Sequence, residues 1–393
     1  MSASYQSENV MQRVAFLSIQ YPPTIGGLQK YISGIIELAP DNVELHVITV
    51  EPNPTMKMIG DRRLEAVYLK AATWFKSYPL INPIKVLTEL KKYSFNRVIV
   101  VYPFPIILDI VAIFCFFRGV TVDCVYVDDI VLNGFIGFVG NLYEKCFSFF
   151  TRRLFSRVFG LSASYLWKST GLKGYTGKII EMPPFVFFPE NIKKNTARAN
   201  ARKQMNLSHY KMIFLFVGGL RERLKYKRID IILKAWAKTQ SGTNNRLLIA
   251  GGGELDYYYK NLADSYKAGN IDFTGFVPDD TLNSLYLAAD VFCIASDDNN
   301  EAFGLVCVEA MGCGCAVVAT AIPGFLGSIG REKLDGVYLA RPGNVDSFAE
   351  GIKFFINHLK PDMATENMNY VKNHFSREVV ANKVRTFFGT SDI

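Results

Sequence analysis

Residues 296–324 read S-D-D-N-N-E-A-F-G-L-V-C-V-E-A-M-G-C-G-C-A-V-V-A-T-A-I-P-G, and this stretch decides the fold of the second half of the chain. The apolar run 291–294 before it predicts a buried strand, and the polar residues 296–300 predict a loop. Apolar residues then recur at helical spacing from about 303 to 313, and 316–319 predicts a second buried strand. Strands that alternate with helices in this way are typical of a parallel α/β sheet.

Two glutamates, Glu301 and Glu309, flank the start of this predicted helix. We expect Glu301 at or just before the first turn and Glu309 two turns in, about 9 Å along the axis. Between them, the free backbone N–H groups of Phe303, Gly304 and Leu305 favour an anion. Such a site fits a diphosphate with a hydroxyl-rich group on each side, as in a nucleotide-sugar. The alternative is that both acids only complement the helix dipole.

The run E-A-F-G-L-V-C-V-E-A-M-G-C-G, followed by A-V-V-A-T and a glycine turn, resembles the E-x7-E signature of glycosyltransferase family 4. That family consists of retaining nucleotide-sugar transferases with the GT-B fold, an α/β fold in which two Rossmann-like, doubly wound domains face each other across a cleft. The resemblance follows the family pattern from about 214 to 345 and covers the N-terminal half only in outline. It implies a hexosyltransferase that moves a sugar from a UDP- or GDP-sugar donor to a hydroxyl of a glycan or lipid-linked acceptor.

The same resemblance assigns roles to individual residues. Glu309 should accept hydrogen bonds from the ribose hydroxyls, and Glu301 should contact the donor sugar. In F-V-G-G-L-R-E-R-L-K-Y-K, Lys227 matches the lysine that binds the donor phosphates. Cations and helix-terminal amides of this kind can stabilise the charge that develops on the leaving phosphate without a metal.

Other expected donor contacts come from loops. Gly219 stands where the family often has an arginine, so Arg221 or Arg223 would have to replace it; the alternative is that 221–228 is a solvated basic loop. The backbone at Phe276 and Val277 should flank the base. In the N-terminal half, the loop 20–27 resembles the family's first loop, and the amide of Gly27 could approach the donor phosphate closely.

Many family members have a histidine after the strand that ends near residue 127, whereas this chain has Asp128 and Asp129. A carboxylate at that strand end would face the ligand, where it could bind a hydroxyl or stabilise positive charge on the anomeric carbon. The alternative is that both aspartates cap a helix or stabilise a turn. The pairs 128–129 and 297–298 lack further metal ligands in sequence, so we expect no obligatory metal and no other cofactor.

The 393 residues suit two domains. We expect a Rossmann-like acceptor-side domain over 1–188 and a Rossmann-like nucleotide-sugar-binding domain over 189–375. A closing helix over about 376–393 should pack back on the first domain. With 49% apolar and 20% charged residues, the composition is that of a folded globular protein.

A net charge of +8 fits an anionic ligand or membrane surface and is too small to indicate nucleic acid as a partner. Seven cysteines, mostly within apolar runs, favour a reducing compartment, and the N-terminus shows no signal peptide. The apolar run 106–117 is short for a membrane span and contains Asp109. We therefore expect a cytoplasmic protein, with peripheral membrane contact as a further possibility.

The segment 134–159 combines aromatic residues with Lys145, Arg152, Arg153 and Arg157. It could be a basic amphipathic helix that touches a membrane or a lipid-linked acceptor. The favoured alternative is a long helix whose apolar stripe belongs to the core.

Two rival functions remain at this stage. One is a non-catalytic partner subunit that binds a nucleotide-sugar, since fold alone does not fix function. The other is a GT-B nucleotide-sugar epimerase or a sugar phosphorylase.

Overall fold

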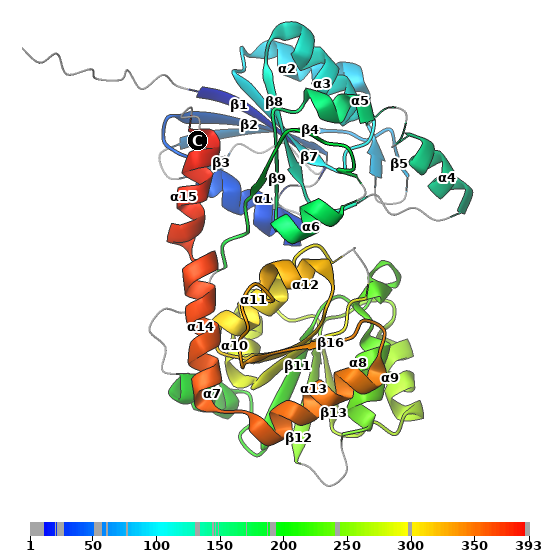
Figure 1. The fold of residues 1–393 in the computed structure, drawn as a ribbon, viewed down its shortest axis with the longest axis vertical. Coiled ribbons are helices and arrows are strands. Elements are labelled where there is room, and N and C mark those ends of the chain that lie inside the picture. The colour runs from blue at the N-terminus through cyan, green and yellow to red at the C-terminus, as the bar shows by residue number, and fades with distance from the viewer. Residues whose placement is uncertain are drawn as a thin grey trace, which may run out of the picture. The chain divides into compact units, whose positions relative to one another are not determined.

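The computed structural model describes residues 12–19, 21, 27–50, 57–59, 62–75, 78–129, 134–143, 145, 147, 149–169, 171–186, 188, 194–239, 244–297 and 301–389. The chain forms two compact units (Figure 1). Unit 1 comprises Met1–Phe185 with Val380–Ile393, and unit 2 comprises Val186–Val379.

Unit 1 is built on an eight-stranded sheet in the order β10-β9-β8-β7-β1-β2-β4-β3. Its strands are β1 (Gln12–Ser18), β2 (Val43–Val50), β3 (Lys57–Ile59), β4 (Arg62–Leu69), β7 (Arg97–Tyr102), β8 (Thr121–Tyr126), β9 (Arg157–Gly160) and β10 (Lys178–Glu181). All neighbours pair in parallel except β3, which runs antiparallel to β4. A separate hairpin joins β5 (Thr73–Phe75) to β6 (Tyr78–Leu80). Because β2 and β7 lie on opposite sides of β1, the sheet has a topological switch point there.

The helices of unit 1 connect these strands. They are α1 (Gly27–Glu37), α2 (Pro83–Lys92), α3 (Ile107–Arg118), α4 (Gly134–Tyr143), α5 (Phe149–Thr151), the short 3-10 helix η2 (Arg152–Leu154) and α6 (Ala163–Lys168). The expectation of one long helix over 134–159 is wrong, because α4 ends at Tyr143 and the chain enters β9 at Arg157. Strand β9 ends at Gly160, and Ser162 caps α6 by accepting a hydrogen bond from the backbone N–H of Tyr165.

The C-terminal helix α15 (Arg377–Phe388) belongs to unit 1 from Val380 onward. There Asp123, which is fully buried, pairs with Arg97 and Arg157. Both arginines also donate to the backbone carbonyl of Phe387, at 2.8 and 3.3 Å. A buried carboxylate needs such partners, and here the same two cations hold the end of the chain against β8 and β9.

Unit 2 contains a six-stranded parallel sheet in the order β13-β12-β11-β14-β15-β16. The strands are β11 (Met212–Val217), β12 (Asn245–Ala250), β13 (Ile271–Gly275), β14 (Val291–Ile294), β15 (Ala316–Thr320) and β16 (Val337–Ala340). Strands β11, β14 and β15 consist entirely of buried residues, as expected for parallel strands covered on both faces. The switch point lies between β11 and β14.

Most helices of unit 2 fall into two groups, and the helices within each group contact one another. Helix α7 (Lys194–Gln204) contacts α10 (Asp279–Ala288), and α11 (Leu305–Gly312) contacts α14 (Pro361–Phe375). In the other group, α8 (Ile229–Ala237) contacts both α9 (Asp256–Ser265) and α13 (Val345–His358). Unit 2 also contains η3 (Glu222–Lys227) and α12 (Pro323–Ser328). Within the described part of the chain, every helix is too short or too polar to span a bilayer.

Candidate functional site

The predicted donor-site residues of unit 2 follow the carboxyl ends of neighbouring parallel strands. Gly219 comes after β11, Phe276 after β13 and Glu301 after β14. The glycines 251–253 follow β12. These four strands are adjacent in the sheet, so their carboxyl ends share one edge. In open α/β sheets, this edge is where ligands bind.

Lys227 and Glu301 meet at the switch point of this sheet. Lys227 ends η3, which follows β11, and Glu301 lies beyond β14. The Lys227 ammonium donates to Glu301 Oε2 at 2.6 Å, and each side chain is only 12% exposed. Ser296 Oγ lies 3.4 Å from the same carboxylate oxygen. Two residues expected to contact different parts of a donor are thus paired with each other.

The pair keeps Lys227 charged. Burial by itself lowers the pKa of the ammonium, but the Glu301 carboxylate outweighs this effect, so the pKa of Lys227 is raised above its ordinary value. A lysine with a raised pKa stays protonated across the physiological range. It is therefore suited to hold a fixed positive charge and unsuited to act as an acid that gives up its proton.

Glu309 lies in α11, where the Tyr286 hydroxyl of α10 donates to Glu309 Oε2 at 2.9 Å. Burial and the nearby carboxylate of Glu309 raise the pKa of Tyr286 well above its ordinary value. The tyrosine thus remains a hydroxyl donor that orients the carboxylate. Nothing in the sequence pattern indicated this partner.

Helix α11 begins at Leu305, two residues later than the periodicity predicts. Gly304 precedes it with φ 74°, a left-handed conformation that interrupts the helix, and a Cβ there would lie 2.3 Å from the Phe325 ring. Glu309 is therefore one turn into the helix, about 6 Å along the axis, and not two. Phe303 and Gly304 are outside the helix, whereas the N–H of Leu305 is in its first turn.

The turns after β11 and β12, next to Lys227, are built from glycines. Gly251 has φ 139°, and a Cβ there would lie 1.9 Å from the carbonyl oxygen of Gly218. A Cβ at Gly219 would lie 2.9 Å from Leu224 Cδ1. The turns after β11 and β12 therefore pack backbone against backbone at Gly218 and Gly251, whereas the atom nearest to a Cβ at position 219 belongs to the Leu224 side chain.

Arg221 and Arg223 are both exposed, on either side of the start of η3. They lie near Glu254, whose pKa is lowered mainly by hydrogen bonds from backbone N–H groups, including that of Glu222, with a smaller contribution from the two arginines. Neither arginine takes part in the Lys227–Glu301 pair.

Phe276 follows Gly275, which has φ 69°, and its side chain is 77% exposed. Val277 is half-buried. A Cβ on Gly252 would lie 3.3 Å from the backbone nitrogen of Phe276, so this backbone lies against the glycine turn after β12.

Arg228 is a residue that the sequence interpretation missed. It adopts φ 49° and ψ 51°, and its guanidinium binds Asp230 at 2.9 Å and also Asp297. The backbone N–H of Asp297 donates to the carbonyl of Tyr226 at 3.2 Å. These contacts tie the segment after β14 to the segment that carries Lys227.

The carboxylate of Asp297 is thus paired with the Arg228 guanidinium. Its sequence neighbour Asp298 lies outside the described residues. In the described ranges, no group of three or more histidine, cysteine, aspartate or glutamate side chains is placed to hold a metal ion.

In unit 1, Gly27 begins α1 and is exposed, with no atom within 4 Å of a Cβ built on it. Residues 22–26 of the predicted first loop lie outside the described part. The switch point of this sheet is next to β1, the strand that precedes this loop.

The two aspartates after β8 have different surroundings. Asp129 is buried and accepts hydrogen bonds from Tyr126 at 2.5 Å, from the backbone N–H of Gly171 at 3.1 Å and from Ser169. Its own N–H donates to the Tyr165 hydroxyl at 3.1 Å. Asp128 is half-buried, and burial together with the charge of Asp129 raises its pKa to about 7. Asp129 therefore anchors the fold, and Asp128 is the better candidate for contact with a ligand.

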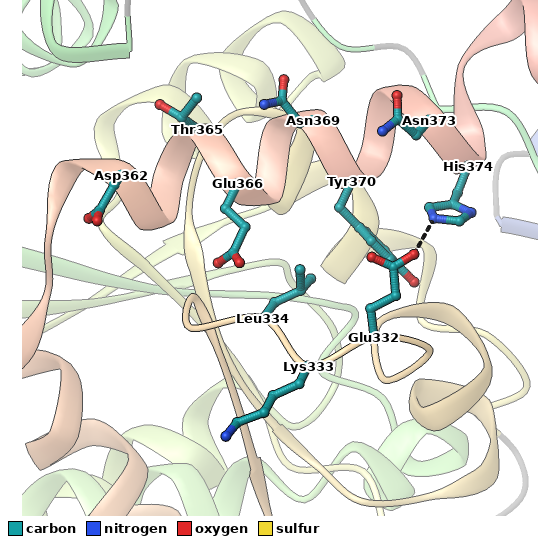
Figure 2. Close-up of a pocket in the computed structure, with 10 residues that line it drawn as sticks. All are labelled: Glu332, Lys333, Leu334, Asp362, Thr365, Glu366, Asn369, Tyr370, Asn373 and His374. Carbon is teal, nitrogen blue, oxygen red and sulfur yellow. Dashed lines mark hydrogen bonds and ion pairs between the residues drawn. The ribbon is translucent and has the colours of Figure 1, made fainter.

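A groove of about 580 Å³ in unit 2 is lined by none of these residues (Figure 2). It lies between α14 and residues 332–334. Glu332 pairs with His374 at 3.0 Å, and Glu366 accepts from the backbone N–H of Asp335 at 3.0 Å. These polar contacts hold the loop before β16 against α14. We therefore attribute the groove to the packing of these two segments.

Comparison with known proteins agrees with this architecture. Residues 197–371 match the family model of glycosyl transferases group 1. An uncharacterised glycosyltransferase of Methanocaldococcus jannaschii is 33% identical over 180 residues, 42% of this chain and 44% of the relative. The lipopolysaccharide 1,2-N-acetylglucosaminetransferase of Salmonella typhimurium is 28% identical over 217 residues, 52% and 55% of the two chains. The chain thus spans about half the length of these curated relatives.

Two solved structures are similar over nearly the whole chain. Sucrose-phosphate synthase from Thermosynechococcus elongatus has a TM-score of 0.74 at 18% identity, covering 96% of this chain and 98% of that one. Anabaena HepE in complex with UDP and glucose has a TM-score of 0.67 at 16% identity, covering 95% and 98%. Residues 197–371 therefore match the glycosyl transferases group 1 in sequence, and the chain has the GT-B fold, an α/β architecture of two Rossmann-like domains.

Proposed function

We propose that this protein is a retaining glycosyltransferase of family 4 type. It would transfer a hexose from a UDP- or GDP-sugar to a hydroxyl of a glycan or lipid-linked acceptor. The observation that carries the proposal is the Lys227–Glu301 pair at the switch point of the unit 2 sheet, on the edge shared by all the predicted donor contacts of that unit.

The donor would lie along this edge. Lys227 uses one N–H for Glu301, which leaves donors for a diphosphate, and its permanent charge would stabilise the leaving group. Glu301 would accept from hydroxyls of the sugar, and Glu309, oriented by Tyr286, would accept from the ribose. The bound UDP and glucose of the Anabaena neighbour support a uridine donor as the first to test.

Retention of the anomeric configuration would follow from attack on the same face from which the phosphate leaves. The leaving phosphate oxygen would take the proton of the acceptor hydroxyl, so no protein carboxylate needs to act as nucleophile. Lys227 and the N–H groups at the start of α11 would supply the charge stabilisation, and we propose that no metal is required.

Asp128 would add a group on the acceptor side. Its raised pKa places protonated and ionised forms within the physiological range, so it can either donate to or accept from a hydroxyl. We place the reaction in the cytoplasm, consistent with the six buried, free cysteines among the described residues.

The test is release of nucleoside diphosphate from UDP- and GDP-sugars, after a thermal-shift screen that selects the donor. We expect Glu309→Gln to weaken UDP or GDP binding, with Glu350→Gln as control because Glu350 is an exposed glutamate of α13. The anomeric configuration of the product, measured by NMR, tests retention. If no nucleoside diphosphate or its sugar raises the melting temperature of the parent, the proposal is wrong.

A further inference from the structure

Helix α3 is apolar around most of its circumference. In the sequence I-L-D-I-V-A-I-F-C-F-F-R, Val111 and Ala112 are fully buried. Away from this face, Ile113 is 45% exposed, Phe116 63% and Phe117 82%. A helix that is apolar on all sides is normally covered on all sides, either by a protein core or by lipid. Here one face packs on the sheet and the other presents large apolar side chains.

The single acid of α3 does not interrupt this exposed face. Asp109 is buried, with 6% exposure, and accepts hydrogen bonds from Tyr143 and Thr151. The Tyr143 hydroxyl also accepts from the backbone N–H of Ile106 at 2.8 Å. Asp109 therefore fastens the segment 143–151 to the start of α3.

That connection adds further exposed aromatic residues. Phe147 and Phe150 are each 65% exposed, and Ile106 is 47% exposed. We call the exposed side chains of Ile106, Ile113, Phe116, Phe117, Phe147 and Phe150 the α3 surface. Of the fourteen large apolar side chains exposed in the described residues, eight lie between 106 and 150, whereas unit 2 has three. The exposed apolar side chains are therefore concentrated on one part of unit 1.

Cations lie next to two half-buried rings, those of Phe114 and Phe149, which neighbour the α3 surface in sequence. Lys91 and Arg118 lie 5.9 and 5.2 Å from the ring centre of Phe114, and Arg153 lies 4.0 Å from that of Phe149. Lys91, Arg118 and Arg153 are all exposed. Aromatic side chains next to lysine and arginine are the chemistry of a bilayer interface, where rings enter the headgroup region and cations bind anionic lipids.

We propose that the α3 surface docks unit 1 on an anionic lipid bilayer. The charge of its neighbours favours this occupant over a second copy of the chain, which would bring the same cations against each other. The inference deepens the proposed function and rests on it in one respect: docking there would bring the enzyme to a membrane that holds a lipid-linked acceptor.

The test is co-sedimentation of the full chain with vesicles of phosphatidylcholine alone and of phosphatidylcholine mixed with phosphatidylglycerol. We expect binding to the mixed vesicles, and Phe116→Ser/Phe117→Ser should lower the partition coefficient at least about tenfold, since each buried Phe favours the apolar phase. Tyr257→Ser/Tyr258→Ser removes two aromatic side chains of unit 2, 77% and 48% exposed, and should bind like the parent.

Charge is tested separately. Arg118→Glu and Arg153→Glu should each weaken binding to the anionic vesicles about fivefold or more, and added salt should reduce the difference between parent and variants. Equal binding of the parent, the phenylalanine variant and the arginine variants would overturn the proposal. So would a parent that fails to bind the mixed vesicles.

Two further measurements separate the remaining outcomes. Sedimentation velocity of the parent without lipid should show one monomeric species; a dimer that Phe116→Ser/Phe117→Ser dissociates would identify the α3 surface as a contact between copies and refute the lipid assignment. The thermal shift with UDP or GDP should be unchanged in that variant. A parent that binds vesicles but no nucleotide would refute the proposed function and leave the docking surface standing.

Discussion

Replacing Lys227 by methionine should destabilise unit 2 even without any ligand. The substitution keeps an unbranched chain but removes the ammonium that neutralises Glu301, whose side chain is 12% exposed. Glu301 would then be a largely desolvated carboxylate without a cation beside it. Ser296 Oγ, 3.4 Å away, would still be a polar neighbour. A buried charge without its partner is strongly unfavourable.

The expected loss follows from the burial of the pair. Removing one partner of a fully buried pair costs about 3–5 kcal/mol, and the remaining exposure of both side chains places this pair at the lower end, about 3 kcal/mol. For a unit of this size, about 3 kcal/mol corresponds to a melting temperature lower by roughly 6–12 °C. In Lys227→Met/Glu301→Gln no charge is left unpaired, and the free energy of unfolding should come back to within about 1 kcal/mol of the parent.

Differential scanning calorimetry of the parent, both single variants and the double variant gives the coupling energy of the pair. We expect the double variant to be about 2 kcal/mol more stable than Lys227→Met, and the coupling energy to exceed this value by whatever Glu301→Gln costs alone.

The stability of the parent should also depend on pH through this pair. The pKa of Lys227 is raised, so the stability that the pair contributes is fully present at neutral pH. It should be lost only as the pH rises above the ordinary value of 10.5 and through the raised pKa. If the losses of stability caused by Lys227→Met and by Glu301→Gln simply add up in the double variant, the two side chains are not coupled, and the explanation of the site from this pair is wrong.

The other predictions concern the remaining candidate residues and the role of a metal. Glu309→Gln should weaken UDP or GDP binding, measured by calorimetry, by roughly 1.5–3 kcal/mol, because a charged acceptor for the ribose is lost; unchanged affinity would remove Glu309 from the donor site. Asp128→Asn should lower kcat about tenfold with little change in nucleotide affinity, whereas Asp129→Asn should lower stability by about 1–3 kcal/mol because Asp129 accepts three hydrogen bonds. Since the pKa of Asp128 is raised from 3.8 to about 7, the parent should lose stability as the pH rises across that interval and Asp128→Asn should lose less; identical pH profiles would contradict the assignment. Donor turnover should survive EDTA, and activity that returns only with added Mg²⁺ or Mn²⁺ would refute the metal-free mechanism.

Much of unit 2 could be predicted because its signals are local. Strands β11 and β14 are continuous apolar runs, β12 and β15 each contain a shorter one, and the helices between them have apolar residues at helical spacing. The position of the donor edge followed from these elements, since parallel strands expose their carboxyl ends together. Local pattern was a poorer guide in unit 1. There 134–159 contains aromatic residues throughout and basic residues from 145 onward, and its division into α4, α5, η2 and β9 depends on what each part packs against.

Adjacent aspartates show what sequence pattern leaves open. Asp128 and Asp129 have the same chemistry and neighbouring positions, and both were candidates for a ligand contact. Only the packing of Tyr126, Ser169 and Gly171 around Asp129 assigns one carboxylate to the fold and leaves the other available.

The sequence by itself indicated most strands and helices of unit 2 and the identity of the charged residues at the donor edge, because apolar periodicity and residue chemistry are properties of short segments. Tertiary structure alone decided that Lys227 neutralises Glu301, 74 residues away, and that Tyr286 orients Glu309. The reason is that both contacts depend on the strand order, which places β14 beside β11 although two strands separate them in the chain. Burial at that junction then makes the pairing of charges obligatory.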